Sequence, residues 1–374
     1  MLGTFIFYIY CIFGLYVFFL AMQNTRTMRD HSFPPESHSQ QFVSVMIPAR
    51  NEASCIAACL DSLLQQTYEH YEILVIDDHS NDSTWDIISW YAEQHDCIHA
   101  FQCTHLPENW QGKNHALHQL VQHARGSLYL FTDADTIHAR ESVAFGVTNL
   151  KKNNIDFFSG FPQQTLQSIP VQLIVSLMHF STSFLFPLFL QYRSRNPLFG
   201  LAIGQYIFMT RDAYQSSGGH EQIKSAITDD IHLAREVIKH GFRQGFLDIR
   251  DIVSCTMYSD TRSAFNGITR SIVDFFDKRV GLIIACTLLL TAFLIIPSLL
   301  FFYFLFAGIV VLPVFIGYLA IAIAWATIVI YHRYSVITAL FTVVSLILPA
   351  TMMIYGVIRI LSKRGIIWKD RPVL

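Results

Sequence analysis

Charged residues are scarce in this 374-residue chain: Asp, Glu, Lys and Arg together make up 14% of it, against 52% hydrophobic residues. Soluble proteins usually carry about a quarter charged residues, so we expect much of this chain to lie in lipid. The 26 basic and 28 acidic residues give a net charge of −2, and no long basic run occurs. Nucleic acid is therefore not an expected partner.

Several cofactor and metal motifs are also missing. The sequence contains neither G-x-G-x-x-G nor G-x-x-x-x-G-K-[ST], which argues against a nicotinamide dehydrogenase and a P-loop enzyme. The seven cysteines include no C-x-x-C pair, and Cys55 and Cys59 stand one helical turn apart, a spacing that suits packing. No H-x-x-x-H pair falls on an expected helix. These absences argue against a structural zinc site and a disulfide framework.

The excess of apolar residues is concentrated at the two ends of the chain. Residues 2–22 carry no charge and are long enough to cross a hydrocarbon core of ~30 Å. No basic leader or small-residue cleavage site is evident, so we expect an uncleaved anchor at residues 1–23. Arg26 and Arg29 follow it, which predicts an outside N-terminus and a cytoplasmic continuation.

A second apolar block, residues 280–358, has room for about three spans, with breaks expected at 306/307 and 332–334. Three spans that start in the cytoplasm would place the C-terminus outside. The basic tail at 359–374 instead favours an inside C-terminus. Either the block makes an even number of crossings or the apolar stretch 166–190 also inserts, and both alternatives stay open.

Between the ends, apolar stretches alternate between strand and helix periodicity. Expected strands and helices alternate along the sequence, in the order 42–47, 51–66, 71–78, 80–95, 98–102, 112–124 and 127–132. This alternation predicts a parallel, doubly wound α/β sheet with helices on both faces, in which ligands bind at the carboxyl ends of the strands. Polar clusters at 48–52, 77–80 and 133–135 all fall at that edge.

Those clusters have the side chains of a nucleotide and metal site. Asp77 and Asp78, in "IDDHSND", could accept hydrogen bonds from a uracil ring and a ribose, although capping of the next helix is the alternative. Asp133 and Asp135, in "DAD", directly follow the apolar "LYLF" and could hold one Mg²⁺ or Mn²⁺ shared with substrate phosphates. Lys113, in "NWQGKNHAL", could meet a phosphate or a sugar hydroxyl.

A further acidic pair, Asp229 and Asp230, lies in the stretch 225–241, just ahead of an expected amphipathic helix. We expect one of the two to cap that helix and the other to face the site. A carboxylate there could take the proton from an acceptor hydroxyl as the hydroxyl attacks a sugar.

Taken together, "VSVMIPARNE", "ILVIDDHSNDST", "DAD" and "TDD" resemble the family 2 glycosyltransferases of the GT-A fold, across about residues 42–245. More narrowly, the chain is similar to membrane-bound enzymes that glycosylate carotenoids, of the diaponeurosporenoate or hydroxychlorobactene type, in "NWQGKNHAL", "GQYIFMTRDAY", "GGH" and the terminal "WKDR". The resemblance implies a parallel or mixed sheet with helices on both faces and transmembrane helices at both ends.

The resemblance also assigns roles to single residues. It places Asp133 and Asp135 at the metal and makes Asp230 the base, with Asp229 standing where the family has Glu. No Q-x-x-R-W follows, which argues against a polymerising enzyme or a ceramide acceptor. Residues expected at the donor are Pro48, Arg50, Glu52, Asp77, Asp78 and Lys113, and those expected at the acceptor are Gln205 and Tyr206.

The expected reaction is an inverting, metal-dependent transfer of a hexose, glucose from UDP-glucose being favoured, to a hydroxyl or carboxyl of a hydrophobic lipid. A hopanoid, a diacylglycerol or a polyprenyl phosphate is the alternative acceptor, and a non-catalytic membrane scaffold is a rival from another class. The stretch 166–190 could lie at the membrane surface and guide the acceptor. The expected catalytic domain, residues 42–250, is cytoplasmic, follows a linker at 24–41 and joins the membrane bundle through 251–279.

Overall fold

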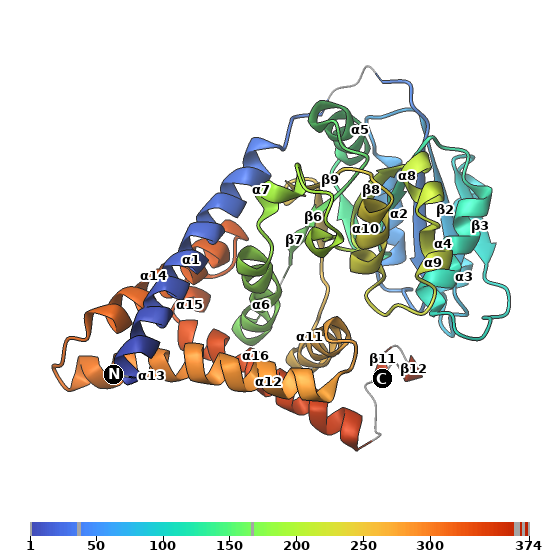
Figure 1. Ribbon diagram of the computed structural model, residues 1–374. Helices are drawn as coiled ribbons and strands as arrows, with labels where there is room; N and C mark the ends of the chain where they lie inside the picture. Colours follow the sequence, from blue (N-terminus) through green and yellow to red (C-terminus); the bar gives the residue numbers. More distant parts are fainter. Residues whose placement is uncertain (1, 36–38, 166–167, 363–366, 369–370, 373–374) are drawn as a thin grey trace. The chain divides into compact units, whose positions relative to one another are not determined.

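A computed structural model describes residues 2–35, 39–165, 168–362, 367–368 and 371–372 (Figure 1). Contacts between residues divide the chain into two compact units, considered one at a time below. The α/β unit comprises residues 27–165 and 188–257, and the helical unit comprises 1–26, 166–187 and 258–374. Half of the expected basic tail at 359–374, including Lys369 and Asp370 of its "WKDR", lies outside the described residues.

A seven-stranded sheet forms the centre of the α/β unit. Its strand order is β3-β2-β1-β4-β8-β6-β9. Nearly every residue of β1, β2 and β4 is buried, as expected for central strands covered by helices on both faces. The strands are β1 (Val43–Ala49), β2 (Tyr71–Asp77), β3 (Ile98–Gln102), β4 (Leu128–Phe131), β6 (Phe157–Phe161), β8 (Ile207–Thr210) and β9 (Gln244–Asp248).

The sheet is mixed because one strand runs against its neighbours. Strands β3, β2, β1 and β4 are parallel, as predicted, whereas β8 pairs antiparallel with both β4 and β6. A small second sheet joins β5 (Thr136–His138), β10 (Val253–Cys255) and β7 (Gln163–Gln164). It anchors the chain just after "DAD", since Cys255 pairs with Thr136. The predicted α/β fold is confirmed.

Helices cover both faces of the large sheet (Figure 1). Alternate residues of β1 enter two separate cores: Val45 and Ile47 pack with α2, α3 and α5, and Met46 packs with α4, α8 and α10. The helices are α2 (Ile56–Leu64), α3 (Thr84–Gln94), α4 (Gly112–His123), α5 (Ser142–Asn153), α7 (Leu188–Gln191), α8 (Arg211–Ser216), α9 (Gly219–Gln222) and α10 (Asp229–Lys239).

The helical unit contains the apolar ends of the chain and one internal segment. Within the described residues, four helices are long and apolar enough to cross a membrane: Phe5–Asp30, Val280–Phe306, Leu312–Tyr331 and Thr342–Leu361. The shorter apolar helix α6 (Ile169–Leu185) lies inside the expected acceptor stretch and packs on α11 (Thr261–Phe275) and on α14 and α16 of the third and fourth spans. Residues 166–187 thus group with the helical unit rather than with the α/β unit that precedes and follows them in sequence.

Two spans differ in detail from the sequence expectation. Helix α1 (Leu2–Asp30) continues through Arg26 and Arg29, beyond the apolar stretch that ends at residue 22. The second span is α12 (Val280–Leu290) and α13 (Ile296–Phe306), joined by a π-helical turn at Thr291–Ile295 just before Pro297. Proline has no N–H, so the carbonyl one turn before it lacks its usual donor. A π-helical turn shifts the hydrogen-bond pattern locally and can supply another donor.

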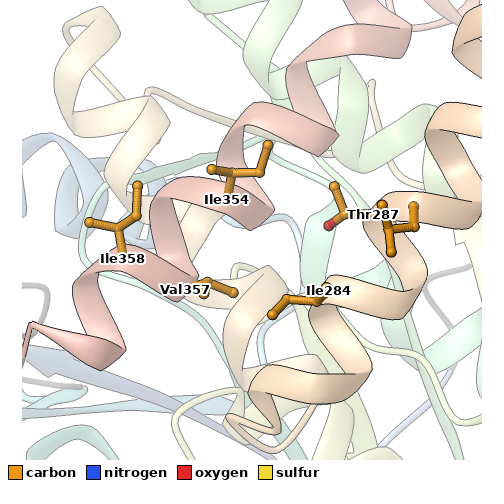
Figure 2. A pocket seen from close by; sticks show the side chains of 6 residues that line it. Ile284, Thr287, Ile354, Val357 and Ile358 are labelled. Carbon is orange, nitrogen blue, oxygen red and sulfur yellow. The ribbon is translucent and has the colours of Figure 1, made fainter.

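Helix α12 packs on α16 (Thr342–Leu361), and an apolar groove of about 240 Å³ lies along their contact. Figure 2 shows Ile284 and Thr287 on α12 opposite Ile354, Val357 and Ile358 on α16. The hydroxyl of Thr287 donates to the carbonyl of Ile283 within its own helix, at 2.8 Å. The groove therefore offers packing surface and no polar chemistry.

One buried carboxylate fastens the amino-terminal edge of the large sheet. Glu72 on β2 is 1% exposed, and its Oε1 accepts from Ser44 Oγ at 2.7 Å and from the Arg125 amide at 2.8 Å. Its Oε2 accepts from Arg125 Nε at 2.7 Å. The carboxylate thus joins β1, β2 and the turn before β4.

We expect Glu72→Ala to lower the free energy of unfolding by about 2 kcal/mol, because the buried Ser44 hydroxyl and Arg125 amide lose their acceptor while the exposed guanidinium regains water. Thermal unfolding of the detergent-solubilised protein measures the change. Glu93→Ala, which removes an exposed carboxylate, is the control. Equal melting temperatures for the two variants would contradict this assignment.

Candidate active site

The loops that follow β1 and β2 are hydrogen-bonded to each other along their length. The amide of Asp78 donates to the carbonyl of Ala49 at 2.7 Å, and Arg50 Nη1 donates to the carbonyl of Asp78 at 2.6 Å. Asn51 adopts a left-handed φ of 52°, which Asn tolerates better than most residues, and its Oδ1 accepts from the amide of Asn81 at 2.8 Å. "PARNE" and "IDDHSND" therefore form one double loop.

Asp77 is the last residue of β2 and Asp78 follows it in this double loop, and both are buried. Asp77 Oδ2 accepts from the amide of Ser80 at 3.3 Å, and its Oδ1 has no hydrogen-bond partner in the described part of the chain. The N-cap residue of helix α3 is Ser83, whose side chain makes no capping hydrogen bond, and the amide of Thr84 donates to Asp82 Oδ1 at 3.0 Å. Capping of α3 therefore does not explain the positions of Asp77 and Asp78.

An ion cluster brings together three segments that are distant in sequence. Lys113, in the first turn of α4, places Nζ 2.8 Å from Asp133 Oδ1 and 3.5 Å from Asp229 Oδ2. Asp133 follows β4, and Asp229 is the first residue of α10. The predicted donor, metal and base residues thus meet around one ammonium group.

Gly204, which the sequence analysis did not single out, lets the backbone approach this cluster. Its amide donates to Asp230 Oδ2 at 3.1 Å. A Cβ on Gly204 would stand 2.9 Å from Lys113 Nζ, 3.7 Å from Asp133 Oδ2 and 3.9 Å from Asp230 Oδ2. A side chain at position 204 would therefore crowd the ammonium, whereas the two carboxylates would lie at ordinary contact distance.

The charges in the cluster alter one another's protonation. Burial of the Asp230 carboxyl and the neighbouring Asp229 raise the pKa of Asp230 to about 7, although Lys113 and two backbone amides act in the opposite direction. Burial lowers the pKa of Lys113, but Asp133, Asp229 and Asp230 outweigh it and raise the pKa above its ordinary value. Lys113 therefore stays charged, while Asp230 can exchange a proton near neutral pH.

The two acids at the start of α10 have different partners. The helix's N-cap residue is Thr228, so neither acid occupies the expected capping position. Asp229 pairs with Lys113, and Asp230 Oδ1 accepts from the amide of Ile231 at 2.8 Å. Asp230 is held by two backbone amides and has no direct ion pair within the described part of the chain, so it is the better placed proton acceptor.

The acids around Lys113 have the composition of a magnesium or manganese site. Asp133, Asp229 and Asp230 surround one ammonium and leave an excess of two negative charges when ionised, and their oxygens are the ligands that hard divalent cations prefer. Asp135 lies partly buried in the turn with Asp133. Among the described residues, no three His, Cys, Asp or Glu side chains are already close enough to enclose an ion. The donor set fits a cation that is shared with a ligand.

Four other predicted site residues lie outside the ion cluster. Tyr206 is fully buried in the core, and its hydroxyl donates to the carbonyl of Ser142 at 2.8 Å, so its side chain does not line the cluster as an acceptor residue would. Gln205 is also buried. Glu52 Oε2 accepts from Cys55 Sγ at 3.0 Å, and Pro48 lies within β1.

The mixed sheet and its acidic edge define a GT-A-type glycosyltransferase fold. Residues 44–218 match the family model described as "Glycosyl transferase family 2", and this part of the chain is a family 2 glycosyltransferase domain. The prediction of a family 2 transferase is confirmed at this level.

Three known proteins illustrate the similarity. The poly(ribitol-phosphate) beta-glucosyltransferase of Bacillus spizizenii is 32% identical over 32% of this chain and 18% of its own, and the 4,4'-diaponeurosporenoate glycosyltransferase of Staphylococcus haemolyticus is 26% identical over 57% and 56%. The chain spans less than two thirds of the length of either curated relative. A mannosyltransferase from Pyrobaculum calidifontis, solved with GDP-Man and Mn2+, shares the fold over 96% of this chain and 100% of its own, with 19% identity and a TM-score of 0.58.

We expect Asp230→Asn to gain stability relative to the wild type as pH rises from 5 to 8. The folded-state pKa of about 7 exceeds the unfolded value of 3.8, so the folded wild type holds more protons in this interval and loses stability as pH rises. Asn does not titrate and removes this loss. Melting temperatures of both proteins at several pH values measure the effect, and a difference that stays constant with pH would contradict the raised pKa.

Proposed function

We propose that this chain is an inverting glycosyltransferase that moves a hexose, glucose from UDP-glucose, to a hydroxyl or carboxyl of a hydrophobic lipid such as a carotenoid. The observation that carries the proposal is the ion cluster of Lys113, Asp133, Asp229 and Asp230 at the carboxyl edge of the sheet. It combines a protonated lysine for a diphosphate with a carboxylate whose pKa is near neutrality.

The donor would bind between the double loop and the ion cluster. The unpartnered Oδ1 of Asp77 is a suitable acceptor for an N–H of the base, and Asp78 is placed beside it for the ribose. Asp133 and Asp135 would hold a Mg²⁺ or Mn²⁺ ion, which supplies positive charge at the diphosphate when bound. The Mn2+ and GDP-Man of the Pyrobaculum protein and the glucosyl transfer in the name of the Bacillus protein support this class of donor.

In the reaction, an acceptor oxygen attacks the anomeric carbon while the bond from that carbon to the diphosphate oxygen breaks. Asp230 takes the proton from an acceptor hydroxyl, and Lys113 faces the negative charge on the leaving nucleoside diphosphate. An acceptor carboxylate arrives already ionised, so Asp230 would then serve mainly to position it. The single displacement inverts the anomeric centre.

A lipid acceptor is supported by the helical unit and by one relative. Four helices have the length and composition of membrane spans, and the Staphylococcus protein is named for a carotenoid acid. We place the protein in the cell membrane as a multi-pass protein, with the α/β unit in the cytoplasm where nucleotide sugars are supplied. An apolar acceptor would then reach the enzyme from the bilayer.

Membranes that contain the protein, incubated with labelled UDP-glucose, UDP-N-acetylglucosamine or GDP-mannose, test the donor and the acceptor together. We expect a glucolipid from UDP-glucose, identified by mass analysis of the lipid extract.

EDTA should stop its formation, and Mg²⁺ or Mn²⁺ should restore it. Asp135→Ala should abolish the product, while Asp96→Ala, an exposed acid, should not. Product from GDP-mannose alone would overturn the choice of donor. A glycosylated hopanoid or diacylglycerol as the product would overturn the choice of acceptor.

We expect Asp230→Asn to reduce kcat for a hydroxyl acceptor by about 10³-fold, because the amide cannot take the proton, while the Kd of the donor stays within a few-fold. Asp229→Asn should instead weaken donor binding, since Asp229 positions Lys113 by an ion pair. Steady-state kinetics and donor titration separate the two effects. A larger kcat loss in Asp229→Asn than in Asp230→Asn would exchange the roles of the two acids.

A further inference from the structure

Beneath the ion cluster lies a set of four buried polar side chains, which we name the His138 cluster: Thr132, Thr136, His138 and Ser142. His138 and Thr136 belong to β5, Thr132 follows β4, and Ser142 begins α5. At most 4% of any of them is exposed. A buried polar network is costly unless every member is satisfied, so its hydrogen bonds specify one geometry.

The two threonines fix separate pieces of backbone that belong to the site. Thr136 Oγ1 donates to the carbonyl of Asp133 at 2.7 Å. Thr132 Oγ1 donates to the carbonyl of Gln205 at 2.8 Å. Because the neighbouring amide of Gly204 donates to Asp230 Oδ2, the second bond secures the loop that holds the proposed base.

The proton of the neutral His138 ring is assigned from the hydrogen bonds around it. Each threonine hydroxyl has one proton, and the two hydroxyl oxygens lie 2.9 Å from each other, with Nε2 at 3.0 Å from Thr132 Oγ1 and 3.2 Å from Thr136 Oγ1. We place the ring hydrogen on Nε2, because this leaves both hydroxyl protons for the carbonyls of Asp133 and Gln205. Nδ1 accepts from Ser142 Oγ at 2.9 Å. Burial lowers the pKa of His138 to about 3, so the ring is neutral.

Further hydrogen bonds hold the Gly204–Tyr206 loop and His138 in place. The hydroxyl of Tyr206 donates to the carbonyl of Ser142, so the loop is bonded to the start of α5 as well as to Thr132. The amide of His138 donates to Ser62 Oγ at 3.0 Å. Tyr206 supports the site from within the core.

We propose that His138 is a positioning residue, whose single Nε2–H holds Thr132 and Thr136 so that the Asp133 turn and the Gly204–Tyr206 loop keep one fixed relation. The inference rests on the proposed function, because it takes Asp133 as a cation ligand and Asp230 as the base. A displacement of about 1 Å at either carboxylate is enough to cost about 100-fold in rate. His138 itself touches no reacting atom.

Two substitutions at His138 separate positioning from mere filling of space. The amide nitrogen of Gln can reach the place of Nε2, whereas the shorter Asn reaches only the place of Nδ1. We expect His138→Asn to lose about 100-fold in kcat and to bind Mn²⁺ at least tenfold more weakly, measured by electron paramagnetic resonance without donor. His138→Gln should restore both to within about fivefold of the wild type. His240→Asn, on an exposed histidine, is the matched control.

Valine substitutions at the two threonines separate the effect on metal affinity from the effect on kcat, because Val has nearly the shape of Thr and lacks the hydroxyl. Thr136→Val should raise the Kd of Mn²⁺ at least fivefold, since it frees the carbonyl of Asp133. Thr132→Val should lower kcat at least tenfold with the Kd of Mn²⁺ unchanged, since it frees the loop at Asp230. A purely structural role would lower the melting temperature of both without this split.

The outcomes are distinguishable. If His138→Asn matches His138→Gln in kcat and Mn²⁺ affinity, the positioning role is overturned. If His138→Asn fails to fold, the two valine variants decide, and wild-type values in both would overturn the inference. A wild type that transfers no sugar but binds Mn²⁺, with weaker binding in Thr136→Val, would refute the proposed function while the link from Thr136 to the Asp133 turn stands.

Discussion

The ammonium of Lys113 is the interaction on which the site depends. Three carboxylates, Asp133, Asp229 and Asp230, arrive from two separate elements, and without a cation among them their mutual repulsion would oppose the fold. A partly buried lysine is equally unfavourable alone. Each charge therefore makes the other acceptable, and the cluster holds α4, the turn after β4 and the start of α10 together before any ligand is bound. Its remaining negative charge is what favours a divalent cation.

Two devices of the backbone make such a dense cluster possible. Gly204 has no Cβ that would crowd the ammonium, and its amide donates a hydrogen bond to Asp230. In the His138 cluster, the two threonine hydroxyls hold the backbone carbonyls of Gln205 and Asp133 in place by hydrogen bonds. Charge selects the ligands of the site, whereas uncharged and fully satisfied hydrogen bonds set its dimensions. This division is physically sensible because neutral networks are insensitive to pH and salt.

Sequence patterns predicted the parts of the structure that depend on local chemistry. The apolar runs of β1, β2 and β4 and the acids directly after them were enough to place Asp77, Asp78 and Asp133 at one edge of a sheet. The resemblance allowed a mixed sheet, but the residues alone did not predict the antiparallel strand β8, because its direction follows from long-range topology. Gly204 stood in the quoted "GQYIFMTRDAY" without an assigned role, and His138 was not singled out, since one glycine or one buried histidine carries no periodic signal. Tyr206 was assigned to the acceptor on resemblance alone, and its burial depends on packing that a sequence motif does not contain.

In the proposed reaction, proton transfer and departure of the diphosphate would be coupled through the same electrostatic field. In the free protein Lys113 lowers the pKa of Asp230 against the opposite effects of burial and of Asp229. A diphosphate that draws the ammonium toward itself leaves Asp230 with less countercharge, and the affinity of that carboxylate for a proton then rises. The base would thus become stronger at the moment when the leaving group gains its positive partner. An ordinary solvent-exposed aspartate, with a pKa near 4, would lack this response, because water would screen it from the lysine.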